Sequence, residues 1–134
     1  MTAEEILRAA KSVLVVDWPS RDVPDALVRA GYDVVVTGGT APYDYSTYLL
    51  DGGEVVVQRS DRPPERADLV YSYRPLDELP EIVRQAQNLG AHAVWGQLPL
   101  EESDRARVIV EAAGLAFVDR PYLSDAVRAL TDLR

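Results

Sequence analysis

Asp17 is the first residue whose type and position could do chemistry, because it ends the apolar run 13–16. An aspartate at the end of a first strand can accept a phosphoryl group or bind Mg²⁺ when further acids and a lysine stand near it. Here Trp18 follows Asp17, Pro19 stands two residues on, and Lys11 is the only lysine. We therefore expect Asp17 to cap the following turn or to pair with an arginine rather than to take part in phosphotransfer.

Other nucleophiles and metal ligands are scarce in this sequence. The chain has no cysteine and one histidine, His92, which precedes an apolar run and should lie at the amino end of a strand, away from a ligand. A Ser-His-Asp or Cys-His arrangement and a zinc site therefore have no support. The sequence predicts a protein that is not an enzyme, with no catalytic and no metal-binding residues.

Apolar runs and amphipathic segments alternate along the chain. The runs predicted as strands are 12–18, 32–39, 53–60, 67–75, 92–99 and 116–121, of which 53–60 is the weakest. The segments predicted as helices are 3–10, 22–32, 76–91, 100–115 and 122–134. Thr2 is predicted to be the N-cap of the first. This alternation predicts a single α/β domain over residues 1–134, with a Rossmann-like, mostly parallel sheet of about five strands and helices on both faces.

Ligands of such sheets bind outside the carboxyl ends of the strands, where the strand order reverses. The segments to inspect are therefore 17–21, 37–43, 72–75, 96–99 and 119–122. The irregular stretch 40–53, which contains three tyrosines, is expected to form a semi-ordered flap or a short helix near this end.

Several polar or flexible residues fall in these segments. Gly38 and Gly39 either let a ligand approach the backbone or form a turn. Arg74 offers a planar fork of donors for phosphate, unless it pairs with an acid of the following helix, Asp77 or Glu78. Tyr73 could flank an adenine ring, and Gln97 could reach a ligand amide.

Charge and composition limit the classes of molecule that we expect the chain to bind. The 134 residues are 47% hydrophobic and 27% charged, and their formal net charge is −8. Binding to nucleic acid or to an anionic membrane needs a clustered basic face, which this balance disfavours. No apolar run approaches the roughly 20 residues of a membrane span, and no signal peptide is visible, so we expect a cytoplasmic protein.

Three segments together resemble a known family. "GAHAVWGQL", followed by an acid-rich helix and "EAAGLAFVDR", is similar to the small stand-alone CoA-binding proteins, whose domain resembles that of succinyl-CoA synthetase. "DLVYSYRPLDELPEIVRQA" looks like their "DVVDIFRRPEDVPEIVEEA", and "ILRAAKSVLVVD" like their "ILKKYKTIAVVG". The resemblance implies a Rossmann-like sheet that holds coenzyme A, with the diphosphate at the turn after the first strand and at the helix N-terminus behind it.

Carried over by position, the resemblance matches Tyr73 and Arg74 to a Phe-Arg of the family, Gln97 to a glutamine, and Asp119 and Arg120 to an Asp-Arg. With the first turn and the glycine pair added, the predicted cofactor-binding residues are Trp18, Pro19, Ser20, Arg21, Gly38, Gly39, Tyr73, Arg74, Gln97 and Arg120. The chain departs from the family pattern in the first turn, where Asp17 replaces the glycine and Pro19 replaces the serine two residues on. "TGGTAP" also replaces a Val-Asn-Pro, and Pro121 and Leu123 replace a Cys and a Lys.

Three functions are compatible with these residues. The first is a non-catalytic module that binds coenzyme A or a related nucleotide, with altered or weakened binding. The second is a degenerate relative that acts as a protein-interaction or regulatory module, with a homodimer or another protein as its partner. The third, a small phosphatase or acyl-transfer enzyme, lacks a nucleophile–base pair to support it.

Overall fold

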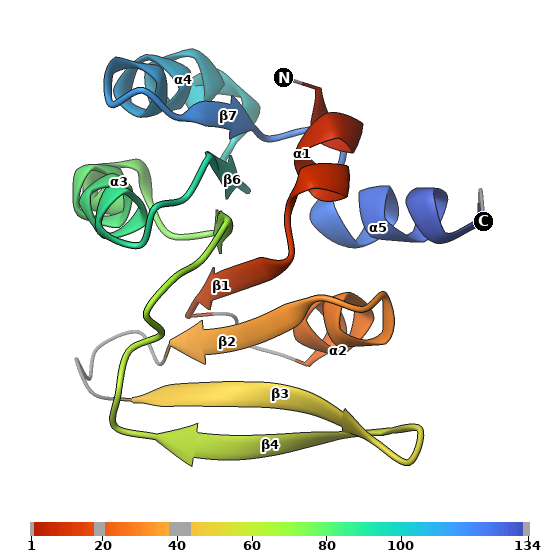
Figure 1. Cartoon of the computed structure of the whole chain (residues 1–134). Coiled ribbons are helices and arrows are strands. Elements are labelled where there is room, and N and C mark those ends of the chain that lie inside the picture. Colours follow the sequence, from red (N-terminus) through yellow and green to blue (C-terminus); the bar gives the residue numbers. More distant parts are fainter. Residues whose placement is uncertain (1, 18–20, 38–43, 133–134) are drawn as a thin grey trace.

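A single seven-stranded sheet organises the chain (Figure 1). The computed structural model describes residues 2–17, 21–37 and 44–132. The strands are β1 (Ser12–Val16), β2 (Asp33–Thr37), β3 (Tyr45–Asp51), β4 (Glu54–Ser60), β5 (Leu69–Ser72), β6 (Ala93–Gly96) and β7 (Ala116–Val118). The helices are α1 (Ala3–Ala9), α2 (Asp22–Arg29), α3 (Leu79–Asn88), α4 (Ser103–Ala112) and α5 (Leu123–Asp132), with short 3-10 turns at Leu76–Glu78 and Leu100–Glu102.

The strand order is β4-β3-β2-β1-β5-β6-β7. Strands β2, β1, β5, β6 and β7 run parallel, and β3 and β4 add an antiparallel hairpin at one edge. The α/β class and the mostly parallel sheet are therefore as predicted, whereas the expected number of about five strands was too low. The predicted strand over 53–60 is β4, and the additional strand is β3.

The hairpin corrects the expectation of a flap or a short helix over 40–53. Residues 45–51 form a seven-residue strand, while residues 40–43 lie outside the described part of the chain. Gly52 and Gly53 make the turn with φ of +59° and +86°. Two consecutive positive φ values are those of a type I′ turn, whose twist matches that of the flanking strands, so the glycine pair sets the hairpin register.

One face of the sheet is covered by α1, α2 and α5. The largest completely buried side chains at this face include Leu7, Leu27, Trp95 and Leu123. Val13 and Val15 of β1 point to the same face, because alternate residues of a strand share a side. The predicted amphipathic helices thus bury their apolar stripes here, and Thr2 caps α1 as expected, accepting a hydrogen bond from the Glu5 N–H at 3.1 Å.

The opposite face is covered by α3 and α4 over β1, β5, β6 and β7 only. Leu14 and Val16 of β1 pack here against Ile82, Val83 and Val110. The outer strands β2, β3 and β4 are covered by α2 from the other side, and Figure 1 shows α3 and α4 well away from the hairpin. Their second face is consequently more open, with Leu49 39% exposed.

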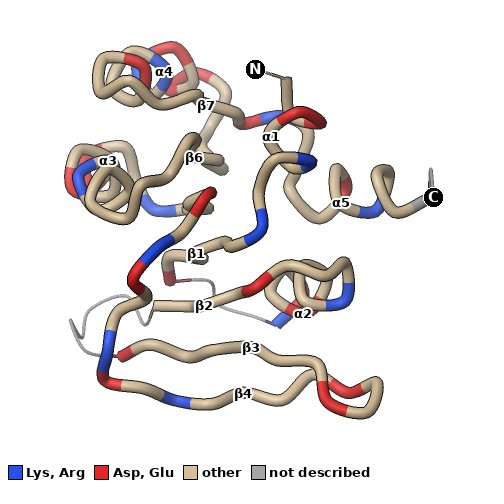
Figure 2. Tube along the Cα trace, viewed as in Figure 1, with Lys and Arg blue, Asp and Glu red and all other residues tan. Residues whose placement is uncertain are grey.

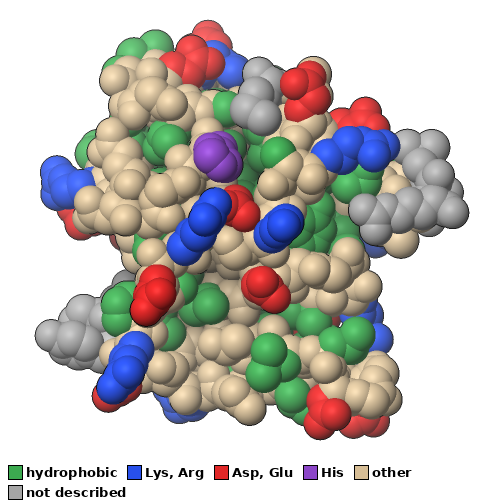
Figure 3. All heavy atoms as spheres, viewed as in Figure 1, with side chains coloured by type: hydrophobic (Ala, Val, Ile, Leu, Met, Phe, Trp, Pro, Cys, Tyr) green, Lys and Arg blue, Asp and Glu red, His purple; other side chains and the backbone are tan. Residues whose placement is uncertain are grey.

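Charged side chains of both signs are interspersed over the described surface. Figure 2 shows Lys and Arg alternating with Asp and Glu along the trace, and the face in Figure 3 carries both signs beside the single histidine. His92 follows the connection into β6, and its N–H donates to the Asp68 carbonyl at 2.9 Å. It therefore lies at the amino edge of the sheet, as predicted.

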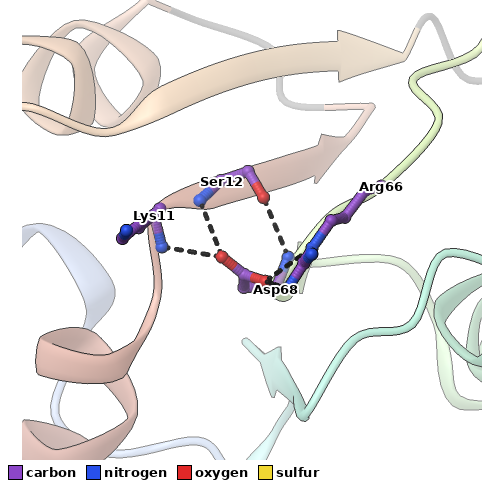
Figure 4. A network of polar contacts seen from close by, with 4 residues as sticks. All are labelled: Lys11, Ser12, Arg66 and Asp68. Carbon is purple, nitrogen blue, oxygen red and sulfur yellow. Dashed lines mark hydrogen bonds and ion pairs between the residues drawn. The ribbon is translucent and has the colours of Figure 1, made fainter.

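A buried carboxylate fastens the start of β1 to the start of β5 (Figure 4). Asp68 Oδ2 accepts the backbone N–H groups of Lys11 at 2.8 Å and Ser12 at 3.2 Å, and Arg66 approaches Oδ1 at 3.4 Å. Burial alone would raise the pKa of Asp68, but these hydrogen bonds and the Arg66 charge outweigh it and lower the pKa below its usual value.

This lowered pKa predicts a pH-dependent contribution to stability. A carboxyl whose folded pKa is depressed stabilises the fold above its unfolded pKa of about 3.9 and loses that effect as pH falls through the folded value. Asp68→Asn should therefore lower the free energy of unfolding by about 1–3 kcal/mol at pH 7, and by less near pH 3. Urea denaturation at both pH values measures this difference, with the exposed Asp61→Asn as the control. If Asp68→Asn lowers the free energy of unfolding equally at both pH values, the lowered pKa of Asp68 is contradicted.

Candidate ligand site at the carboxyl edge of the sheet

The strand order reverses between β1 and β5. The chain moves outward from β1 to β2, β3 and β4, then returns to the other side of β1 to form β5. Val16 is paired with Ser72, so the residues after these strands, Asp17 and Tyr73, emerge side by side at one edge. In open parallel sheets this reversal leaves the crevice in which ligands bind. Among the described residues of the selected segments, Asp17 and Tyr73 are thus neighbours at the carboxyl edge.

Asp17 adopts a backbone conformation that normally favours glycine. Its φ is +53°, the one positive value among the described non-glycine residues. Its N–H donates to the carbonyl of Thr37 at 2.9 Å, which holds the turn against the end of β2. Aspartate and asparagine tolerate this left-handed region better than other side chains. The first turn therefore keeps a glycine-like backbone although the residue carries a carboxylate.

Arg74 neutralises that carboxylate. Its Nη1 lies 2.8 Å from Asp17 Oδ2, while its Nε and Nη2 donate to Glu78 Oε2 at 3.1 and 2.8 Å. The hydrogen bond to Glu78 is the main cause of a raised pKa for Arg74, and Asp17 adds to it. The expectation that Asp17 pairs with an arginine is confirmed. Arg74 also pairs with Glu78, one of its two predicted acidic partners.

Tyr71 and Gln97 form a second polar contact at this edge. The Tyr71 hydroxyl donates to Gln97 Oε1, and burial is the first cause of a raised Tyr71 pKa. Gln97 is half-buried, and its N–H donates to the Ser72 carbonyl at 2.9 Å, which fixes the chain just past β6. Tyr71 was not selected from the sequence. Side chains alternate between the two faces of a strand, so Tyr71 shares a side of β5 with Tyr73. This alternation was the signal in the sequence that could have identified Tyr71.

The end of β7 contributes a buried acid and an exposed arginine. Asp119 is 8% exposed and accepts a hydrogen bond from the Ser103 hydroxyl at the start of α4. Arg120 donates to the Asp119 carbonyl at 3.0 Å, and its guanidinium carbon lies 5.5 Å from the centre of the Tyr122 ring. Arg120 is thus at the carboxyl edge, stacked on its neighbour and open to solvent.

Arg21 is engaged with the hairpin. Its Nη2 donates to the Val55 carbonyl at 3.1 Å, its guanidinium lies 5.6 Å from the Tyr48 ring centre, and Nε approaches Asp25 at 3.4 Å. These contacts hold α2 against β3 and β4. The remaining predicted site residues lie outside the described part of the chain: Trp18, Pro19, Ser20, Gly38 and Gly39.

The described residues contain neither a cluster of metal ligands nor a helix that could span a membrane. Within residues 2–17, 21–37 and 44–132, His, Asp and Glu side chains form no group of three or more that could hold a metal ion. In the same residues, each helix is too short or too polar to cross a bilayer.

Known structures share this architecture. The crystal structure of Prb, described as PH1109 protein redesigned for binding, superposes with a TM-score of 0.69 at 24% identity, over 96% of this chain and 89% of that one. The structure of cell-free ID.343 from Thermus thermophilus superposes with a TM-score of 0.62 at 21% identity, over 96% of this chain and 99% of that one. The crystal structure of a protein of unknown function from Methanothermobacter thermautotrophicus superposes with a TM-score of 0.54 at 12% identity, over 86% of this chain and 80% of that one. At these identities the likeness establishes the fold alone.

The sequence itself carries the family assignment. No curated protein matches it at a significant level. The profile of the CoA binding domain matches residues 13–124, which include β1, the reversal between β1 and β5, and the start of α5. This match covers most of the chain. The chain therefore belongs to the CoA-binding domain family.

Proposed function

We propose that this chain binds coenzyme A, or a closely related nucleotide, at the carboxyl edge of its sheet and acts there as a binding module without catalysis. The observation that carries the proposal is the position of Arg74. Its guanidinium lies at the reversal between β1 and β5, 2.8 Å from the carboxylate that follows β1. Membership of the CoA-binding domain family supports the same ligand.

Arg74 suits a diphosphate because its planar fork can donate two parallel hydrogen bonds to phosphate oxygens. Its side chain is 30% exposed, so a ligand can reach it. The same guanidinium already binds Asp17 and Glu78, and an incoming phosphate competes with both carboxylates. Bound diphosphate therefore requires Asp17 to turn away from Arg74, and this exchange lowers the affinity below that of an uncharged first turn.

Neighbouring groups suit the other parts of the ligand. Gln97 is anchored through its oxygen by Tyr71, which leaves its amide nitrogen positioned to donate to a pantetheine or adenine acceptor. Tyr73 is half-exposed beside Arg74 and offers a ring on which an adenine could stack. We assign these residues to binding and orientation only.

The Asp17–Arg74–Glu78 contact also supports a second candidate function. An arginine that is fully engaged by two carboxylates resembles a structural ion-pair network, as expected of a relative that no longer holds a nucleotide. In that case the chain is a protein-interaction or regulatory module. The two functions differ in their response to nucleotides.

Calorimetric titration with coenzyme A, NAD and ATP separates the two functions. For the binding module we expect saturable binding of coenzyme A, and we expect Arg74→Gln to weaken it about tenfold or more, because a charge-assisted hydrogen bond contributes about 1.5–3 kcal/mol. Arg105→Gln, which removes an exposed charge from α4, is the matched control and should bind as the unmodified protein does. Absence of binding by all three nucleotides at millimolar concentration would favour the interaction module.

A further inference from the structure

The amino edge of the sheet, opposite the proposed nucleotide site, contains a cleft of about 540 Å³. It lies over the starts of β1, β2 and β5, on the face that α3 and α4 leave open beyond β1. The connection from β4 to β5 passes along it and contributes Pro64, Arg66 and Ala67 to its wall. A cleft of this volume is within the range of small-molecule sites.

Two opposite charges line this cleft without neutralising each other. Lys11 and Asp33 stand at the starts of neighbouring strands, where the Asp33 N–H donates to the Lys11 carbonyl at 2.8 Å. Both side chains are exposed, and neither has an ion-pair partner within 4.0 Å among the described residues. The cleft thus presents an ammonium group and a carboxylate that are both available to a ligand.

A second cation stands on the same wall. The Arg66 side chain is 73% exposed, and its contacts to Asp68 are long, at 3.4 Å. Asp68 itself is occupied, because its other oxygen accepts the N–H groups of Lys11 and Ser12 (Figure 4). Arg66 can therefore turn toward a ligand carboxylate, whereas Asp68 is held in place by its two backbone hydrogen bonds between β1 and β5.

The rest of the lining is partly apolar, with Ser12 and His92 as its further polar residues. Val35 and Pro64 are half-buried at the sides of the cleft, above the completely buried Leu14. An aliphatic group laid on Val35 and Pro64 would be removed from water, which is favourable by about 25 cal/mol per Å² of apolar surface. The cleft combines this surface with separated charges of both signs.

We propose that the amino-edge cleft binds a small zwitterion, an α-amino acid with an apolar side chain. Lys11 and Arg66 hold its carboxylate, Asp33 holds its ammonium group, and its side chain covers Val35 and Pro64. This site is independent of the carboxyl edge, since the two lie at opposite ends of the strands. A module with both sites could sense an amino acid while it binds a nucleotide.

Titration of ¹⁵N-labelled protein with L-leucine tests the proposal. We expect saturable shifts of the backbone amides of Ser12, Asp33 and Ala67, with a dissociation constant in the millimolar range or tighter. N-acetyl-leucine, which lacks the ammonium group, and leucinamide, which lacks the carboxylate, should each bind at least fivefold more weakly. Equal binding of either analogue, or no saturable shift up to about 50 mM leucine, would overturn the proposal.

Variants assign the two charges. Lys11→Gln and Asp33→Asn should each weaken leucine binding at least fivefold, and both positions are exposed, so the fold should persist. Arg105→Gln removes a charge outside the cleft and should leave the affinity unchanged; a similar loss in this variant would mean that only net charge is sensed. Coenzyme A titrations of the same variants should be unaffected, which keeps a failure of this site distinct from a failure of the proposed nucleotide site.

Discussion

Asp17→Gly is expected to raise the affinity for coenzyme A about tenfold or more. The substitution removes a carboxylate from the turn nearest the expected diphosphate and releases Arg74, which now lies 2.8 Å from that carboxylate. Glycine adopts a φ of +53° without strain, so the turn should keep its shape. A gain of tenfold corresponds to about 1.4 kcal/mol, close to the lower end of the contribution of one charge-assisted hydrogen bond. Calorimetric titration measures it.

Two further substitutions at Asp17 separate charge from backbone conformation. Asp17→Asn keeps the side-chain shape and tolerates the left-handed conformation, so it should also raise the affinity. Asp17→Ala removes the charge but destabilises the turn by up to about 1–2 kcal/mol, since alanine lacks the short polar side chain whose local hydrogen bonding offsets the strain of this conformation. If all three variants bind coenzyme A no better than the unmodified protein, the Asp17 carboxylate does not oppose the ligand.

Trp95→Ala is expected to have the largest effect on stability, a loss of about 3–5 kcal/mol. Trp95 lies in β6 and is 1% exposed, and it is paired across strands with Tyr71 of β5 and Val118 of β7. Truncation leaves a cavity between the sheet and α5 and also leaves the Pro121 carbonyl without its indole partner, now at 3.1 Å. A loss of this size is comparable to the total stability of many domains. Urea denaturation followed by circular dichroism measures it.

Trp95→Phe separates the contribution of the buried ring to stability from that of the indole N–H. It keeps most of the buried ring and removes the indole N–H, so the free energy of unfolding should fall by about 1–3 kcal/mol, the combined effect of a lost hydrogen bond and a small cavity. Val108→Ala, at a position that is 68% exposed on α4, should change it by less than about 0.5 kcal/mol. A Trp95→Ala loss no larger than that of Val108→Ala would mean that the packing around Trp95 is not as described.

Most of the fold could be predicted because its signals are local. The valine-rich run at 12–16 and Thr2 before α1 depend only on neighbouring residues. Strand β3 was missed for the opposite reason. Tyr45–Asp51 mixes aromatic and small polar residues, and it becomes a strand because β2 and β4 pair with it on either side. The Gly52-Gly53 turn was the local signal that could have revealed the hairpin.

The candidate site was predictable in location but not in detail. Strand ends place Asp17, Arg74 and Gln97 at one edge in any sheet with this order. Asp17 pairs with Arg74, which is 57 residues away in sequence, because β1 lies next to β5. Local sequence patterns do not encode this strand pairing. The hydrogen bond between Tyr71 and Gln97 likewise joins neighbouring strands that are 26 residues apart in sequence.

The central position of β1 has a consequence for synthesis. It is synthesised before the other strands of this sheet, yet its partner on one side, β5, follows 56 residues later, as the pairing of Val13 with Leu69 shows. Until β5 arrives, β1 exposes an apolar edge of unpaired backbone groups next to β2, and such edges are prone to associate with other chains. The nascent chain is thus most vulnerable to aggregation between the emergence of β2 and that of β5. Chaperone binding is expected to concentrate in this interval.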